Sequence, residues 1–347
     1  MWPRKKTMKE NKVVVACLII IVIFIVGVVL RLAKPVLFPF VLAIFLSFVL
    51  SPALDFMNRL KIPKSVSLIF IIIFAFLVIY LLGLLFYSSG KAFASELPNY
   101  NQKIGSILAP IQDQIQRIIP EWEPVDWVGQ LDVSKIGGFF ISSLGPFFAF
   151  MSNLFLVFIF LIFILAGRGN LKIKIRNCFD DKRSLQIVDI IQNIDVQIQK
   201  YLFIKTVISF ATGVFATVVL LIFGVDFAIV FGFFTFILNY IPNIGSIIAT
   251  ALPVAFAAFQ FETLWPAFLI FLILGSIQMT LGNFVEPRVM GQGLGLSTLV
   301  VLFFLFFWGW LWGIGGMILA VPTAAIIKIV CRNIPPLNFV AELMSKG

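Results

Sequence analysis

The chain has 347 residues, of which 61% are hydrophobic and only 12% charged, and its mean hydropathy is +1.08. Soluble domains hold roughly 45–50% apolar and about 25% charged residues, so this composition excludes a water-soluble globular protein. The apolar stretches run for about 15 to 25 residues without period-two alternation, which argues against a transmembrane β-barrel. The sequence therefore predicts an all-α polytopic protein embedded in the lipid bilayer.

The charged and metal-binding residue types narrow the function classes further. Histidine is absent, and the three cysteines, Cys17, Cys178 and Cys331, are far apart in the sequence. This leaves no pattern typical of a metal site or a disulfide framework. The net charge of +10 is typical of topology signals in a membrane protein and does not indicate nucleic-acid binding. With no nucleophile–base pair or phosphate-binding loop, we expect no cofactor and no enzymatic activity.

Unbroken apolar runs predict the membrane spans. Long runs lie at 13–33, 36–54, 65–89, 145–166 and 206–224, and shorter or interrupted runs lie at 226–241, 244–261, 264–282, 297–312 and 313–331. About eight transmembrane helices with a re-entrant hairpin and about ten short spans fit this pattern equally well. Whether 226–261 spans the membrane or re-enters it therefore stays open, and we expect the C-terminal segments to be broken or re-entrant.

Basic residues before the first run, between the second and third runs, and after the fourth place these segments on one side. By the positive-inside rule, the N- and C-termini are expected in the cytoplasm. On the other side, a helical repeat from Leu97 to Ile118 predicts an amphipathic helix outside the bilayer. A second repeat at 187–201 forms an apolar stripe suited to helix pairing.

These features divide the chain into five parts. The parts are a three-helix membrane segment (1–90), a non-cytoplasmic amphipathic segment (91–144), the fourth span with a basic cytoplasmic connection (145–205), a C-terminal membrane transport block (206–331) and a cytoplasmic tail (332–347).

The first candidate motif is a polar break between two apolar runs, from Asn239 to Ser246. Such a break frees backbone groups that hydrocarbon cannot satisfy, so it must be buried in protein or line water. Transporters place broken helices of this kind at their binding sites. A plain surface turn between two helices is an equally good interpretation of the residues alone.

The second motif runs from Gly282 to Ser297 and contains Glu286, the leading candidate for a protonatable or cation-binding group. An ion pair between Glu286 and Arg288 would need a bend at Pro287, since residues two apart do not face each other on a helix. Arg288 alternatively reaches cytoplasmic headgroups. Three glycines follow and indicate a hinge or close packing: Gly291, Gly293 and Gly295.

The third motif contains Trp308, Trp310 and Trp312, which predict an interfacial aromatic belt at the turn of a helical hairpin. Gly309 and Gly313 within it form a GxxxG pair, a signal of close helix contact. Lys205, at the start of the fifth run, is interpreted as a cytoplasmic anchor.

These motifs resemble those of the autoinducer-2 exporter family, the PerM/TqsA-like proteins, and most closely its TqsA-like branch. The matching residues are Asn239 to Ser246, Gly282 to Gly291, Gly293 to Ser297, Trp308 to Trp310, and Gly316-Met317 to Val321-Pro322. The order of segments matches over most of the chain, and the N-terminal half matches in pattern only. The resemblance implies a multi-pass protein of the bacterial inner membrane that forms a homo-oligomer.

The resemblance also assigns pathway roles to residues at the two polar motifs. The residues expected to line a substrate or ion pathway are Asn239, Pro242, Asn243, Gly245, Asn283, Glu286, Pro287 and Arg288. Three functions remain open at this point. The first is export of a small polar signal, autoinducer-2 in the TqsA-like branch. The second is a sodium (or lithium)/proton antiporter centred on Glu286, and the third is an oligomeric membrane scaffold.

Overall fold

The computed structural model describes residues 7–118, 154–167, 170–291 and 294–346. Within these ranges the chain is helical, apart from short connections and one isolated β-bridge between Leu296 and Ser345. Five helices are long and apolar enough to cross a membrane, and shorter apolar helices accompany them. The predicted all-α polytopic membrane fold is confirmed.

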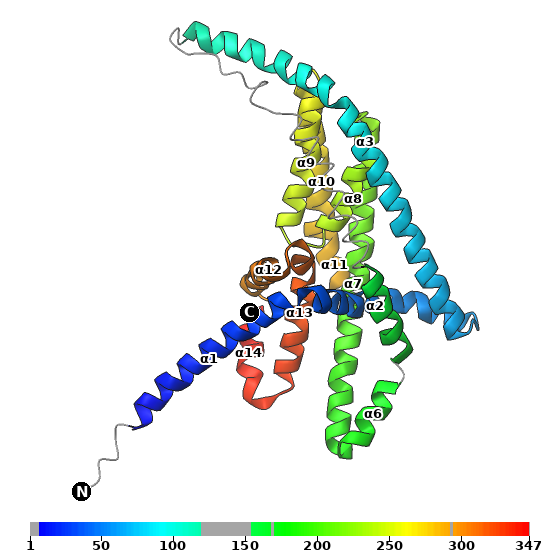
Figure 1. Cartoon of the computed structure of the whole chain (residues 1–347), viewed down its shortest axis with the longest axis vertical. Helices are drawn as coiled ribbons and strands as arrows, with labels where there is room; N and C mark the ends of the chain where they lie inside the picture. The colour runs from blue at the N-terminus through cyan, green and yellow to red at the C-terminus, as the bar shows by residue number, and fades with distance from the viewer. Residues whose placement is uncertain (1–6, 119–153, 168–169, 292–293, 347) are drawn as a thin grey trace.

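The N-terminal part consists of α1 (Thr7–Leu32), α2 (Lys34–Arg59) and α3 (Lys64–Ile118). α1 projects away from the other helices, and α3 runs along the opposite edge of the molecule (Figure 1). α3 continues without a break past the boundary predicted at residue 90, so the amphipathic segment begins as the far part of the same helix. The apolar stretch and the amphipathic stretch both favour helix, and no residue between them ends the helix.

A helix at Leu154–Gly167 lies against α2 and packs on Ala43 through Val157 and Leu161. This helix is the described part of the fourth predicted span. Residues 145–153 of that span, residues 119–144 of the non-cytoplasmic segment and Gly293 lie outside the described residues.

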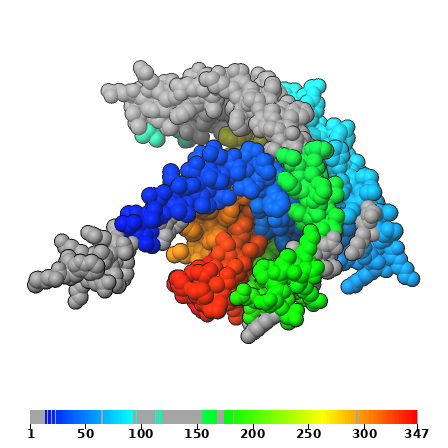
Figure 2. All heavy atoms as spheres, turned by 60° about the horizontal axis from the view of Figure 1, so that its bottom comes forward, coloured from blue at the N-terminus to red at the C-terminus, as the bar shows by residue number. Residues whose placement is uncertain are grey.

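After the short α6 (Asn170–Cys178), α7 (Asp181–Ile222) forms the axis of the molecule. Its 42 residues correspond to about 63 Å at 1.5 Å per residue, roughly twice the hydrocarbon thickness. One helix therefore contains both the amphipathic stripe at 187–201 and the fifth predicted span. The boundary predicted at residue 205 falls inside this helix. Figure 2 shows the lower part of α7 and α6 in green beside the C-terminal helices in red.

Short helices surround the upper part of α7 (Figure 1). They are α8 (Ala228–Leu238), α9 (Ile244–Gln260), α10 (Trp265–Gln278), the π-helix η1 (Met279–Val285) and α11 (Glu286–Met290), of which the last three form one continuous rod. With 11 residues, α8 is too short to cross a bilayer that requires about 20. α8 packs closely on α7, because a Cβ on Gly232 would overlap Thr217.

The C-terminal part contains α12 (Thr298–Trp312), α13 (Ile314–Arg332), the 3₁₀ turn η2 (Pro335–Leu337) and α14 (Asn338–Leu343). α12 and α13 form a tight hairpin, since a Cβ on Gly316 would overlap the carbonyl oxygen of Trp308. α13 also packs against α7. A core cluster containing Leu202, Trp312 and Leu319 joins this hairpin to α7 and α2.

Candidate functional site

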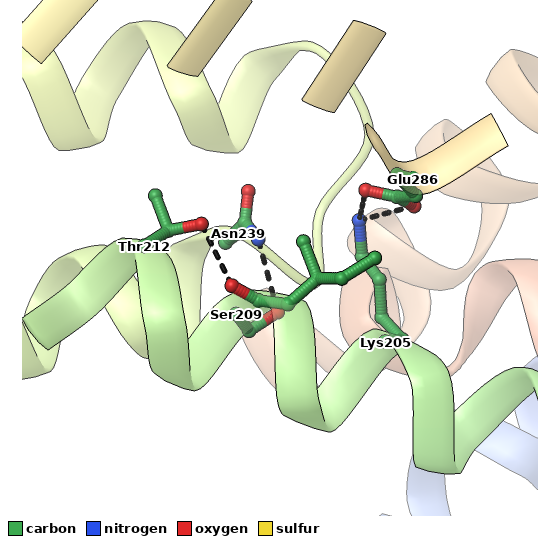
Figure 3. Close-up of polar contacts among 6 residues, drawn as sticks. Lys205, Ser209, Thr212, Asn239 and Glu286 are labelled. Carbon is green, nitrogen blue, oxygen red and sulfur yellow. Dashed lines mark hydrogen bonds and ion pairs between the residues drawn. The ribbon is translucent and has the colours of Figure 1, made fainter. Parts of the chain in front are cut away.

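One face of α7 carries three buried polar side chains in an otherwise apolar setting. Lys205, Ser209 and Thr212 are spaced by four and three residues, so they lie in a row along one side of the helix (Figure 3). Buried polar groups inside a membrane are expensive, and they are found mainly where they pair or serve a function. This face of α7 is therefore a candidate functional site.

Lys205 pairs with Glu286 of α11. Its Nζ donates two hydrogen bonds to the carboxylate, at 2.7 Å to Oε1 and 2.8 Å to Oε2 (Figure 3). The two side chains are only 7% and 17% exposed. Charge-assisted bonds in such surroundings are strong, and breaking a buried pair leaves an uncompensated charge. The pair joins α7 to α11 through two residues that are 81 positions apart in the sequence.

This pairing changes two of the predictions. The interpretation of Lys205 as a cytoplasmic anchor is wrong, because the side chain is buried and its charge is compensated by Glu286. Arg288 is exposed, and the partner of Glu286 is Lys205, so no bend at Pro287 is needed to form an ion pair.

Asn239 of the first motif meets the same face of α7 one turn further along. Its Nδ2 donates to the Ser209 Oγ at 3.0 Å, and both residues are buried (Figure 3). Next to it, the Tyr240 hydroxyl donates to Thr206 Oγ1 at 2.7 Å. The polar break between α8 and α9 is thus anchored on α7, and the two predicted motifs contribute neighbouring contacts to one helix face.

The rest of the first motif builds the turn between α8 and α9. Asn243 is exposed and has φ +59° and ψ −57°, close to the central residue of a γ-turn, in which Ile244 N donates to the Pro242 carbonyl at 2.6 Å. Pro242 is half-buried. Gly245 is buried at the start of α9, where a Cβ would overlap the carbonyl oxygen of Leu238. These residues shape the turn that brings Asn239 to α7.

The second motif contains a seven-residue π-helix directly before Glu286. π-helices are rare and occur frequently at functional sites. Asn283, within it, is exposed, and so are Pro287 and Arg288. Of the four predicted pathway residues in this motif, Glu286 is therefore the one that the structure places against α7.

The described glycines at the hinge and packing positions have different environments. Gly291 ends α11 with a φ of +66°, and Gly295 has a φ of +58° in the following loop. Gly313 turns the chain between α12 and α13 with a φ of +73°. Gly309 faces Met317 across that hairpin, so it serves close packing.

Trp310 and Trp312 differ in their surroundings. Trp310 is 60% exposed and lies under the guanidinium of Arg31, as expected for an interfacial aromatic residue. Trp312 is 3% exposed, and its Nε1 donates to the carbonyl of Leu30. The predicted aromatic belt therefore does not include Trp312, because the hairpin folds it against α1 and α2.

A cavity of about 140 Å³ lies one helical turn from the ion pair. Its lining comes from α7, from the end of α11 and from the loop after it, through Gln197, Lys200, Tyr201, Ile204, Met290 and Leu294. It has room for several water molecules and offers an ammonium, an amide and a phenol group. Along α7 the order is thus cavity, ion pair and hydroxyl groups.

Sequence reasoning found Glu286 and Asn239 but missed their partners on α7. The signal was present, since Lys205, Ser209 and Thr212 share one helix face in a span that is otherwise apolar. Comparison with known proteins gives the family of the chain. A family model described as AI-2E family transporter matches residues 18–335. The chain belongs to the AI-2E transporter family.

Three relatives match this AI-2E transporter over most of its length. The AI-2 transport protein TqsA of Escherichia coli K12 is 33% identical over 96% of this chain and 95% of its own length. A protein of Borreliella burgdorferi, named only as a candidate transport protein, is 32% identical over 92% of this chain and 86% of its own. YhhT of Escherichia coli K12 is 27% identical over 94% and 92%. The chain is thus a multi-pass membrane transporter of this bacterial family.

Proposed function

We propose that this transporter exports a small, uncharged, hydroxyl-rich signal of the autoinducer-2 type across the inner membrane, and that the Lys205–Glu286 pair is its gate. The observation that carries the proposal is the bidentate pairing of these two side chains, at 2.7 and 2.8 Å, on the polar face of α7. The similarity to the TqsA of Escherichia coli supports the choice of autoinducer-2.

The ion pair favours an uncharged solute. An exchanger of sodium and protons needs a carboxylate that is free to bind either one, whereas both oxygens of Glu286 are occupied by the ammonium of Lys205. The pair has no net charge, so a cation approaching Glu286 also meets the repulsion of Lys205. A polyhydroxylated solute instead needs hydrogen-bond partners, which Ser209 and Asn239 provide next to the gate.

The order of features along α7 supports a route through the protein. Gln197 of the cavity and Thr212 of the hydroxyl face are 15 residues apart, which is about 22 Å along a helix. With the basic connection on the cytoplasmic side, the cavity opens toward the cytoplasm and the gate lies beyond it. A solute would therefore enter beside Lys200 and Tyr201 and pass outward between Lys205 and Glu286.

We further propose that the chain works as a homo-oligomer with both termini in the cytoplasm. The exposure of α3 supports an oligomer, since its apolar window is only 6% buried. Apolar surface of this extent must be covered by lipid or by a second copy of the chain.

Flux in proteoliposomes tests the proposal. Vesicles containing the purified protein and loaded with autoinducer-2 should release it faster than protein-free vesicles. In the same vesicles, internal pH should stay flat after an external sodium or lithium pulse. The Glu286→Gln variant should retain some autoinducer-2 flux, because the solute needs no carboxylate.

The opposite pattern would replace this function with the antiporter. Sodium-dependent alkalinisation of the vesicle interior in the wild type, abolished by Glu286→Gln and without autoinducer-2 release, would contradict signal export. Neither activity in vesicles that contain folded protein, together with co-purifying membrane proteins, would instead favour the scaffold.

A further inference from the structure

Beyond the ion pair, four polar side chains from four different helices line one narrow seam. They are Thr212 of α7, Thr235 of α8, Thr250 of α9 and Gln278 of α10, and the rest of the lining is apolar. The three threonines are 1%, 1% and 8% exposed. Convergence of a few polar groups in apolar surroundings is typical of small-molecule sites.

The hydrogen bonds of these residues define what the seam can bind. Thr212 donates to the carbonyl of Ile208 at 2.8 Å, and Thr235 donates to the carbonyl of Phe231 at 2.9 Å. Since each hydroxyl proton is already used, the free lone pairs of both oxygens can only accept hydrogen bonds. These two side chains therefore suit a ligand that carries O–H groups.

The other two side chains are not committed to partners. Among the described residues, no hydrogen bond reaches the side chains of Thr250 and Gln278. Thr250 is buried as a residue and Gln278 is half-buried, so a ligand in the seam would give both side chains a hydrogen-bond partner. The amide of Gln278 adds two donors and an acceptor. No charged side chain from the described part of the chain lines the seam, so an ion would find no compensating charge there.

The seam is closed in this conformation, with no room for a water molecule. A solute can enter only if the helices move apart. Two features next to the seam permit such a movement. Gln278 is the last α-helical residue before the π-helix η1, and α8 is joined to α9 through the turn at Asn243. The gate and the seam share α7, where Thr212 lies seven residues after Lys205.

We propose that the seam between α7, α8, α9 and α10 is an occluded binding site for an uncharged polyol, held by Thr212, Thr235, Thr250 and Gln278. This inference rests on the proposed function, because it locates the solute of the same pathway after it has passed the gate. It names the four side chains as those that determine specificity.

Substitutions that keep the shape and remove the polar group test the site. Thr212→Val, Thr235→Val and Thr250→Val should each raise the KM for autoinducer-2 release about three- to tenfold, as expected for one lost hydrogen bond. Gln278→Leu should have a larger effect. Thr250→Ser keeps a hydroxyl at this position, so its KM should stay close to that of the wild type. The matched control is Thr323→Val on α13, whose hydroxyl bonds within its own helix and away from the seam.

The probes separate this site from the identity of the signal. Erythritol and ribose should be tested beside autoinducer-2 in the same vesicles. If the wild type moves these polyols but not autoinducer-2, and the seam variants slow them, the site stands and the proposed signal is wrong. If autoinducer-2 moves equally well in the wild type and all four seam variants, the site is wrong and export stands. Wild-type vesicles with folded protein that move no polyol would overturn the site as well.

Discussion

Lys205 and Glu286 lie where a single charge would have little access to water. Their side chains are 7% and 17% exposed, and each is the ion-pair partner of the other. The cost of removing one charge therefore differs from the cost of removing both, because only the first change leaves an unpaired charge behind.

A double-mutant cycle should show this difference. Lys205→Met alone should lower the free energy of unfolding by about 3–5 kcal/mol, and Lys205→Met combined with Glu286→Met by much less. Unfolding in detergent micelles measures both. The control is Lys200→Met, which replaces an exposed lysine on the same helix and should change the free energy of unfolding little. Equal losses in the single and double variants would show that the pair does not act as a unit.

Gly245 is required for another physical reason. A methyl group at this position would overlap the carbonyl oxygen of Leu238, so the turn between α8 and α9 would have to open. Gly245→Ala should lower the free energy of unfolding by about 1–3 kcal/mol. Gly275→Ala on α10 should be neutral or stabilising, since nothing lies within 4 Å of its added methyl and alanine favours helix. A neutral Gly245→Ala would contradict this packing.

At the scale of elements, the loop between α11 and α12 is held by the C-terminal part of the chain. Lys328 of α13 donates to the carbonyls of Leu294 and Gly295 at 3.2 and 2.6 Å. The backbone of the tail adds two bonds, from Lys346 N to Gly295 O and from Ser297 N to Met344 O, both 2.9 Å. Because this loop follows α11, the contacts restrain the helix that carries Glu286.

Removal of the Lys328 ammonium should loosen this loop. In Lys328→Met, the backbone amides of Leu296 and Ser297 should exchange with deuterium about tenfold faster or more, as expected for the loss of charge-assisted bonds. Lys346→Met is the matched control, because Lys346 contributes its backbone nitrogen to the loop and should keep the protection. Unchanged exchange in Lys328→Met would show that the tail alone holds the loop.

The sequence predicted the elements better than their connections. Apolar length sufficed for α2, for the first part of α3 and for the helices from α8 to α13, because hydrocarbon requires continuous helix. It did not reveal that α7 is one helix, since the amphipathic and apolar parts of α7 differ in pattern. Asn239 and Glu286 were predictable as polar residues in apolar runs. The pairing of Glu286 with Lys205 was not predictable, because 81 residues separate the two and only the packing of α11 on α7 brings them together.

At the scale of the whole molecule, orientation decides which end of the pathway is the entrance. The basic connection contains α6, and Cys178 at its end is exposed, whereas Cys331 is buried. Cys17 is exposed but lies in the apolar helix α1, where we expect lipid to cover it.

Cys178 therefore reports the orientation of the protein. A membrane-impermeant maleimide added to intact cells should not label it, whereas labelling should appear after the inner membrane is permeabilised. The Cys178→Ser variant should lose this signal and thereby assign it. Labelling of Cys178 in intact cells would reverse the orientation and place the cavity at the exit.

The gate itself is tested most directly by reversing its charges and measuring autoinducer-2 release from loaded vesicles. Lys205→Glu places two carboxylates opposite each other, and we expect the saturable flux to be lost. Lys205→Glu combined with Glu286→Lys restores an ion pair of opposite direction and should recover much of the flux. If the single reversal transports like the wild type, or the restored pair transports no better than the single reversal, the Lys205–Glu286 pair is not the gate.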